Sequence, residues 1–312
     1  MKCLVSGATG FIGRRLCQQL SASGHTVVAL SRNGGPLDSG EPTLAVDLAA
    51  TDLRADWLQG VDVVFHLAGI AHQQASPAAY TALNYRATTR LASLASAAGV
   101  TCFVYLSSVK AMGAPHVREP RTELQVTPPA DAYSASKWQA ECALRDAYGA
   151  AGMSVAIVRP ALVYGRQPKG NLRALDTAVR WGLPRPPPIG RRSMIALDDL
   201  VSLLLRIAQQ PPPGVQTWIA CGAGSYSTRE IYDLLRAARG RGPGVAWLPH
   251  WAWRLGARLI DTVAPGAEST YDKIFGTELY SNAAVTRDTG WQPQLTLESE
   301  ISLWSGIEGG HS

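Results

Sequence analysis

A glycine-rich segment near the start of the chain constrains the fold of this sequence more than any other feature. Gly7-Ala-Thr-Gly-Phe-Ile-Gly13 separates a short apolar run at residues 3–5 from a helical period over residues 10–23. Glycines at this place let the backbone turn tightly and approach a pyrophosphate, and the start of the helix contributes N–H donors and the positive end of its dipole. The spacing, GxxGxxG, is one residue longer in its first gap than the usual dinucleotide fingerprint. Its position between the first strand and the first helix still predicts a dinucleotide site.

Short apolar runs and helical periods alternate through the first half of the chain. They predict strands at 26–30, 44–46, 61–67, 102–106 and 154–158, and helices at 78–98 and 132–150. Strands that alternate with helices in this way are joined by right-handed crossovers. We therefore predict an α/β fold built on a Rossmann-type, doubly wound parallel sheet.

The pattern becomes less regular after Pro160. Runs of proline and glycine interrupt it, and between them we expect helices at 172–182 and 198–209, a strand at 217–220, and a helix that starts with a Ser227–Glu230 capping box. We predict a dinucleotide-binding domain at residues 1–165 and a smaller, interleaved substrate lobe at residues 166–312, some segments of which return to the first sheet. The amphipathic segment at 247–260 holds three tryptophans, and we expect it to pack in the core rather than contact a membrane.

Composition narrows the class of protein. The 312 residues are 46% apolar and 17% charged, which is typical of a soluble globular enzyme and too apolar for a disordered chain. The formal net charge of +5 comes from scattered arginines, so we expect an anionic small-molecule substrate and no nucleic acid. Five cysteines without CxxC spacing indicate free thiols in a reducing compartment and no metal site. No apolar run approaches the roughly 20 residues of a membrane span, so a cytoplasmic protein is the expectation.

The end of the second predicted strand bears on which dinucleotide binds. An acidic residue there would hold the ribose 2′-hydroxyl of NAD(H), but the chain has Ser31-Arg32 and no carboxylate. Arg32 can bind a 2′-phosphate with Ser31 as a further hydrogen-bond partner, unless Arg32 is only a solvated loop residue. We therefore favour NADP(H) and keep NAD(H) as the alternative. Asp47, after the third strand, either accepts a hydrogen bond from the adenine amino group or caps the following turn.

Tyr133 and Lys137 lie four residues apart in a predicted helix, so their side chains project from one face. A free phenol has a pKa of about 10, and a nearby cation favours its ionised form. Tyr133 is therefore a candidate general acid or base at a carbonyl or carbinol, with Lys137 adjusting its pKa. The pair alone is a common pattern, and the upstream glycine segment is what makes it a candidate catalytic pair.

Several motifs, in a characteristic order, make the chain similar to a known family. They are GATGFIG at residues 7–13, Asp47-Leu48, HLAG at 66–69, Asn84 with Thr88, Ser107-Ser108, YSASK at 133–137 and VRPALVYG at 158–165. The sequence resembles the extended short-chain dehydrogenase/reductases, in particular the NAD-dependent epimerase/dehydratase group that acts on nucleotide sugars. The resemblance covers nearly the whole chain. It implies a catalytic triad of Ser108, Tyr133 and Lys137, and a homodimer formed through the helices near Asn84 and Lys137.

The resemblance also implies which other residues line the site. Those expected to contact the cofactor are Gly7, Thr9, Gly10, Phe11, Ile12, Gly13, Ser31, Arg32, Asp47, Leu48, Leu67, Ala68, Gly69, Ser107, Tyr133, Lys137, Pro160 and Val163. Those expected to contact the substrate are His72, Ser108, Tyr133, Asn171, Leu172, Arg192 and Lys273. Arg192 starts a run in which a guanidinium fork would bind a diphosphate. Asn84 and His66 are expected to support the architecture rather than react.

Three reactions compete within the family. Dehydratases carry Asp-Glu directly after the serine or threonine, whereas this chain has Val109-Lys110, so dehydration is disfavoured. An epimerase typically keeps NAD held by an acidic residue after the second strand, which Ser31-Arg32 does not supply. The motifs look most like bacterial reductases of UDP-4-keto-6-deoxy-N-acetylhexosamines, which make precursors of surface polysaccharide such as O-antigen.

We therefore predict a 4-ketoreductase that acts on such a UDP-sugar. A 4-epimerase of UDP-hexoses or UDP-N-acetylhexosamines is the alternative, and a non-catalytic dinucleotide-binding sensor is a remote one. The role of Lys110 stays open between a function at the site and a solvated loop cation.

Overall fold

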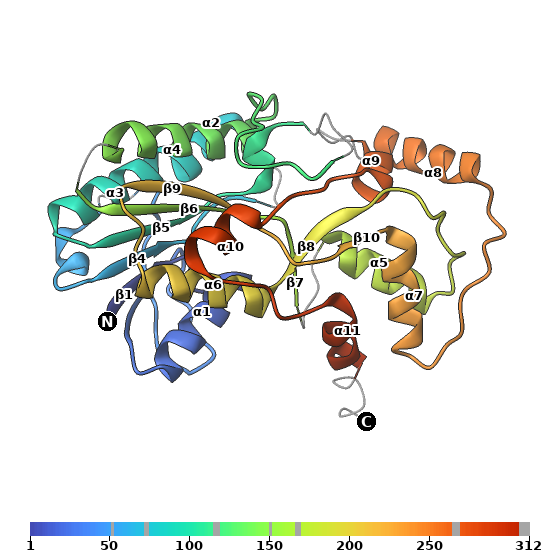
Figure 1. Cartoon of the computed structure of the whole chain (residues 1–312), viewed down its shortest axis with the longest axis horizontal. Helices are drawn as coiled ribbons and strands as arrows, with labels where there is room; N and C mark the ends of the chain where they lie inside the picture. Colours follow the sequence, from blue (N-terminus) through green and yellow to red (C-terminus); the bar gives the residue numbers. More distant parts are fainter. Residues whose placement is uncertain are drawn as a thin grey trace.

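The computed structural model describes residues 1–50, 53–71, 75–114, 119–149, 152–165, 170–263 and 269–305. Figure 1 shows a central sheet with helices on both faces and a second, smaller lobe beside it. The main sheet has seven strands in the order β3-β2-β1-β4-β5-β6-β9, and every pair is parallel. The predicted α/β fold with a doubly wound parallel sheet is confirmed.

The strands of the main sheet come from both halves of the chain. They are β1 (Lys2–Ser6), β2 (Thr26–Ser31), β3 (Leu44–Ala45), β4 (Val63–His66), β5 (Cys102–Leu106), β6 (Ser154–Pro160) and β9 (Val215–Ala220). The strand order changes direction between β1 and β4. Ligands of such sheets bind in the crevice outside the carboxyl ends of the strands at this point. Because all pairs are parallel, the carboxyl ends of these strands lie along one edge of the sheet, which is where the sequence predicts the site.

Apolar residues on both faces of β1 explain why the sheet is covered on two sides. Cys3 and Val5 belong to a core with α1 (Phe11–Ala22) and α6 (Leu197–Gln209), whereas Leu4 belongs to a core with α3 (Ala87–Ala97) and α4 (Ala132–Tyr148). Successive side chains of a strand point to opposite faces, so a continuous apolar strand requires helices on both. α10 (Ala283–Thr289), from the end of the chain, joins the α1 side through buried Val285.

The helix predicted at 78–98 is present but is not uniform. α2 (Pro77–Tyr80) leads into a π-helical stretch, η2 (Thr81–Arg86), which continues into α3. π-helical turns are rare in proteins, but those that occur are often found at functional sites. This one contains the buried Asn84. Two short 3-10 helices, η1 (Ala55–Leu58) and η3 (Val109–Met112), complete the first half, and η3 directly follows Ser108.

The second lobe has a small sheet of its own with the strand order β10-β8-β7. Its strands are β7 (Leu162–Tyr164), β8 (Arg192–Ala196) and β10 (Ser225–Tyr226), and α5 (Gly170–Arg180), α7 (Thr228–Ala237) and α11 (Leu297–Ser305) pack with them. The capping box predicted at the start of α7 is confirmed, because Ser227 and Glu230 each accept from the other's backbone N–H. The domain boundary near residue 165 remains a prediction.

We predicted that the amphipathic segment at 247–260 packs in the core, and this prediction is wrong. Most of it forms α8 (His250–Val263), which contacts α9 (Thr270–Phe275) at the outer edge of the second lobe (Figure 1). Ala257 is the one buried residue of α8, and Trp247 and Trp251 are 69% and 66% exposed. α9 has six residues, so it covers one face of α8 and leaves the rest in solvent. Among the described residues, no helix is both long and apolar enough to cross a bilayer.

Candidate active site

The glycine segment joins β1 to α1 in the tight geometry that its sequence predicts. Gly7 has a φ of +72°, and a Cβ there would lie 2.8 Å from Ala68 N. A Cβ on Gly13 would lie 2.2 Å from Gly7 O, and none of the described side chains caps the start of α1 at Gly10. Because a side chain at these positions would collide with backbone, the cradle stays open to a pyrophosphate at a helix N-terminus. These residues fit a dinucleotide.

The residues between the glycines have different neighbours. Ile12 packs against the core on the α1 side, and the Phe11 ring lies so close to Gly165 that a Cβ there would be 3.2 Å from its Cζ. The Thr9 carbonyl accepts a hydrogen bond of 3.1 Å from Arg14 Nε.

The end of β2 places Arg32 in solvent and Ser31 in the interior. Ser31 Oγ lies 2.5 Å from Thr43 Oγ1 and accepts from Gly34 N at 3.0 Å, so its hydroxyl holds the loop together. Arg32 is exposed at the carboxyl end of the strand. Asp47 accepts from Ala49 N at 3.0 Å and so caps the following turn, and its contact with the adenine amino group stays a prediction. Leu48, beside it, is 4% exposed and packs in the core on the α3 side.

Asn84 holds the loop after β4 against α4. Its side chain accepts from Ile70 N at 2.9 Å and donates to Ile70 O and Ser136 Oγ, each at 3.1 Å. Leu67, Ala68 and Gly69 lie in this loop, and a Cβ on Gly69 would be 3.0 Å from Asn84 Oδ1 and 3.2 Å from Lys137 Nζ. Asn84 thus has the architectural contacts that the sequence predicts.

His66 is likewise a core residue, as expected. Its two ring nitrogens lie 2.7 Å from Ser6 Oγ and 2.8 Å from Thr88 Oγ1. Burial, with a smaller effect from the charge of Lys137, lowers the pKa of His66 to about 3. The imidazole is therefore neutral at physiological pH and joins β1 to α3 by hydrogen bonds.

The three predicted catalytic side chains lie together at the carboxyl end of β5. Ser108 comes two residues after the strand and accepts from Lys110 N at 3.2 Å, and its side chain is near enough to the Tyr133 phenol to lower the pKa of that group. Lys137, one turn further along α4, donates to Leu106 O at 2.9 Å and is 4% exposed. The structure therefore brings Ser108, Tyr133 and Lys137 into one cluster beside the loop that Asn84 positions.

Burial sets the protonation of this cluster. It raises the pKa of Tyr133, and the nearby Ser108 hydroxyl acts in the opposite direction. Burial also lowers the pKa of Lys137 to about 8, against the charge of Glu141. The Lys137 ammonium donates to the Leu106 carbonyl and lies 4.8 Å from the centroid of the Tyr105 ring. Ser108 is thus a group that offsets the rise in the pKa of Tyr133, and the predicted effect of Lys137 on this pKa stays a prediction.

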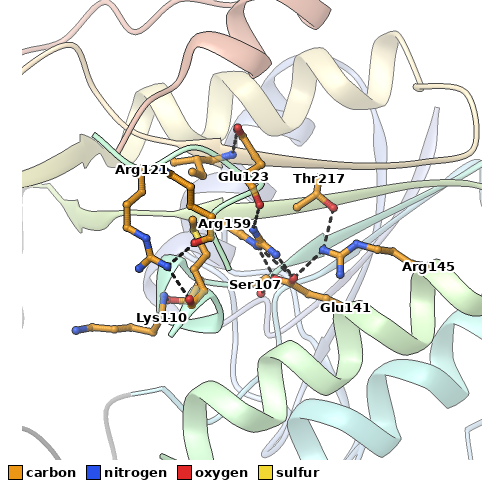
Figure 2. A network of polar contacts seen from close by, with 12 residues as sticks. Ser107, Lys110, Arg121, Glu123, Glu141, Arg145, Arg159 and Thr217 are labelled. Carbon is orange, nitrogen blue, oxygen red and sulfur yellow. Dashed lines mark hydrogen bonds and ion pairs between the residues drawn. The ribbon is translucent and has the colours of Figure 1, made fainter. Parts of the chain in front are cut away.

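A buried ion pair behind the triad anchors α4, and the sequence analysis missed it (Figure 2). Glu141, one turn beyond Lys137, accepts hydrogen bonds from Arg159 Nη2 at 2.5 Å and from Arg159 Nε at 3.0 Å. The side chains of Glu141 and Arg159 are at most 1% exposed. Ser107 Oγ donates to the same carboxylate at 2.5 Å. The Ser107 hydroxyl, predicted to line the cofactor site, is therefore directed into this network. A charged residue within the apolar run of β6 was the signal that could have revealed Arg159.

Lys110 is paired rather than solvated. Its Nζ lies 3.1 Å from Glu278 Oε1, and the same oxygen lies 3.4 Å from Arg192 Nη2. Burial alone raises the pKa of Glu278, but the charges of Lys110 and Arg192 outweigh it, so the pKa lies below its usual value. The segment that carries Glu278 pairs with β8 through a bridge to Arg192 and a hydrogen bond from Ser193 N. Glu278 is a second residue that the sequence analysis did not single out.

The remaining predicted residues lie around this cluster to differing degrees. Arg192 also donates to the Asp272 carbonyl, next in the chain to Lys273, and its Nε is buried with no hydrogen-bond partner among the described residues. Pro160 ends β6, and Val163 lies in β7 against the core on the α1 side. Leu172 is buried in the core of the second lobe, so its backbone alone is available to a ligand. His72 and the side chain of Asn171 lie outside the described residues.

Comparison with known proteins decides the family. The profile of the "NAD dependent epimerase/dehydratase family" matches residues 3–219, which include the glycine cradle and the whole triad. The chain belongs to this family. As a member of the NAD dependent epimerase/dehydratase family it is an NAD(P)-dependent enzyme of the extended short-chain dehydrogenase/reductases, as the motifs predicted.

Relatives of the chain within the family perform more than one reaction. The chain is 30% identical to a UDP-glucose 4-epimerase of Vibrio cholerae, over 95% of this chain and 92% of the relative. It is 28% identical to a 2-alkyl-3-oxoalkanoate reductase of Stenotrophomonas maltophilia, over 96% and 97% of the two chains. The structure of MoeE5 in complex with UDP-glucose and NAD is 25% identical, with a TM-score of 0.77 over 99% of both chains. Family membership therefore establishes the chemistry of the cofactor and leaves the reaction open.

Proposed function

We propose that this protein reduces the C4 ketone of a UDP-4-keto-6-deoxy-N-acetylhexosamine for the synthesis of a surface polysaccharide such as O-antigen. The observation that carries the proposal is the cluster of Ser108, Tyr133 and Lys137 at the carboxyl end of β5, in which burial raises the pKa of the phenol. A phenol that keeps its proton at neutral pH is suited to donate it to a ketone oxygen, as reduction requires. Val109 is buried and Lys110 is paired with Glu278, so the positions after Ser108 offer no carboxylate for dehydration.

The side chains divide the work at the ketone oxygen. A bound nicotinamide dinucleotide supplies the hydride at C4 of its ring. Ser108 and Tyr133 hold the ketone oxygen between two hydroxyls, and Tyr133 passes it a proton as negative charge develops there. Lys137 places a cation at the ribose side of the site. Asn84 and the Glu141–Arg159 pair keep α4 and the loop after β4 in position.

The substrate's diphosphate is assigned to Arg192. Its Nε is buried without a protein partner among the residues described, and a guanidinium can offer a fork of donors to phosphate oxygens. Asn171, the Leu172 backbone, His72 and Lys273 are proposed to complete the contacts with the nucleotide sugar. UDP-glucose in the MoeE5 complex supports a UDP-linked substrate for this chain as well.

NADPH is the proposed reductant. The exposed Arg32 at the end of β2 is placed to meet a 2′-phosphate, and the sequence has no carboxylate there to hold a 2′-hydroxyl. Several structural neighbours are complexes with NAD, as MoeE5 is, so NAD(H) is the competing cofactor. Arg32→Ala should raise the Kd for NADPH and leave that for NADH nearly unchanged. Equal effects on both would reverse the assignment.

A 4-epimerase of UDP-hexoses or UDP-N-acetylhexosamines is the second candidate. The 30% identity to a UDP-glucose 4-epimerase over almost the whole chain is what supports it. The deciding experiment incubates the purified protein with a UDP-4-keto-6-deoxy-N-acetylhexosamine and NADPH, and separately with UDP-GlcNAc or UDP-GalNAc and NAD. The reductase consumes NADPH stoichiometrically with the ketone. Interconversion of the two amino sugars without net NADPH consumption would replace the reductase with the epimerase.

Assembly and location complete the proposal. We propose a homodimer in which η2 and α4 of two copies pack together, since a shallow hollow on this face is lined by Tyr85, Trp138 and Cys142. Trp138→Glu should convert the dimer into a monomer in light scattering. Free thiols at all five cysteines support a cytoplasmic location, where thiols stay reduced.

A further inference from the structure

α8 presents a row of large apolar side chains to solvent. Trp251, Leu255, Leu259 and Val263 follow one another at four-residue spacing, so they form one stripe along the helix. Their exposed fractions are 66%, 51%, 60% and 87%. Single exposed apolar residues are ordinary on a protein surface, but a contiguous stripe marks an interaction site.

The stripe is not the face that α8 uses to pack on the protein. That face is formed by Ala257, which is buried, and by Trp253, whose ring meets Phe275 of α9 edge-on at a centroid distance of 5.8 Å. Ile260, 52% exposed, borders the stripe. In the loop before the helix, Val245 and Trp247 are 73% and 69% exposed, so large apolar residues also precede α8. The helix is thus apolar both toward the protein and away from it.

The charges beside the stripe are basic. Arg254 and Arg258 are exposed, lie one turn apart and directly precede Leu255 and Leu259 in the chain. The acidic residue in the sequence of α8, Asp261, comes three residues after Arg258, so it lies between the arginines and the packing face of the helix, and it accepts from Thr270 N at 2.9 Å. Arginine next to tryptophan and leucine suits the boundary between anionic headgroups and acyl chains. A second copy docked antiparallel on the stripe would bring the arginines of both helices to the same side.

We propose that α8 docks the enzyme on a membrane surface that contains anionic phospholipids. The helix lies in the plane of the surface, with the stripe of Trp251, Leu255, Leu259 and Val263 among the upper acyl chains and Arg254 and Arg258 at the phosphates. Figure 1 shows α8 at the outer edge of the second lobe, beyond the small sheet, where a flat surface can reach it. The proposal is independent of which reaction the active site performs.

The test measures co-sedimentation of the full-length protein with vesicles of phosphatidylcholine alone and of phosphatidylcholine mixed with phosphatidylglycerol. We expect binding to the mixed vesicles that weakens as salt is added, because anionic headgroups contribute. Leu255→Gln/Leu259→Gln should weaken binding by about tenfold or more, since two inserted side chains are lost. Arg254→Gln/Arg258→Gln should remove the preference for phosphatidylglycerol. The matched control is Leu124→Gln, an equally apolar side chain that is 94% exposed elsewhere on the surface and should change nothing.

Circular dichroism and turnover of soluble substrate should be unchanged in all three variants, which shows that they are folded. Failure of the wild-type protein to bind mixed vesicles would overturn the proposal. So would binding that survives Leu255→Gln/Leu259→Gln, or a concentration-dependent dimer that this variant abolishes while the wild-type protein ignores vesicles. That last result would assign the stripe to a second copy of the chain.

Discussion

Lys110, two residues after the serine of the triad, forms an ion pair with Glu278 near the other end of the chain, at an N···O distance of 3.1 Å. Glu278 also pairs with Arg192, the residue proposed to bind the substrate's diphosphate. One carboxylate thus connects η3 of the first half of the chain to β8 of the second lobe. We therefore expect a substitution of Glu278 to affect both the packing of these two parts of the chain and the proposed substrate site at Arg192.

Glu278→Gln should lower the free energy of unfolding by about 1–3 kcal/mol, because two cations lose their shared counter-ion and Lys110 is only partly exposed. Urea denaturation at neutral pH measures the loss. The pKa of Glu278 is lowered in the folded state, so its contribution is present above the ordinary carboxyl pKa and disappears as the pH falls through the folded value. The difference between wild type and variant should therefore shrink in acid. Asp56→Asn, which breaks a fully exposed pair with Arg54, should leave the free energy of unfolding nearly unchanged.

Tyr133→Phe should reduce turnover by about 10²–10⁴-fold, because the ketone oxygen loses its proton donor. Binding of NADPH, followed by its fluorescence, should be nearly unaffected. Tyr80 is the matched control: its ring centroid lies 6.0 Å from that of Tyr133, and Tyr80→Phe should retain most of the turnover. Full activity in the Tyr133 variant would remove it from the catalytic assignment.

The activity should fall on the alkaline side as Lys137 loses its charge. Burial lowers the pKa of Lys137 to about 8, so kcat/KM should decline as the pH rises through that value. Because the pKa of Lys137 is lower in the folded protein than in the unfolded chain, its buried charge destabilises the fold at pH values below about 8. This destabilisation decreases as the pH rises from about 8 to 10.5, the ordinary pKa of lysine. The contribution of Lys137 to the free energy of unfolding therefore becomes more favourable as the pH rises, so unfolding caused by this group does not explain the decline in kcat/KM. A profile that stays flat to pH values well above 8 would contradict the prediction.

Arg159→Met should be among the most destabilising substitutions in the chain, by about 3–5 kcal/mol in urea denaturation, because it leaves the Glu141 carboxylate buried and poorly paired. Arg145→Met is the matched control, since Arg145 binds the same carboxylate at 2.9 Å from a position 36% exposed (Figure 2). Its loss should be under about 1 kcal/mol. Equal losses in the two variants would show that burial does not separate the two pairs.

The local order of the chain made much of the fold predictable. The apolar runs marked the strands because a sheet covered on both faces needs continuous apolar residues, and the glycine segment marked the cradle because other residues would collide there. The capping box of Ser227 and Glu230 is a contact over three residues, so it too follows from the sequence. Tyr133 and Lys137 could be paired in advance because one helix carries both.

Contacts across long sequence separations were decided by the tertiary structure. Lys110 could not be assigned because its partner Glu278 is 168 residues away. The hydroxyl of Ser107 is directed to Glu141 rather than to the cofactor side, a contact that depends on how α4 packs beside β5. The apolar pattern of α8 was visible in the sequence and led to the expectation of a core helix. An amphipathic pattern predicts that a helix has an apolar face. Whether another element covers that face depends on which parts of the tertiary structure pack beside it. Here the six residues of α9 reach one side alone, and the stripe from Trp251 to Val263 remains open.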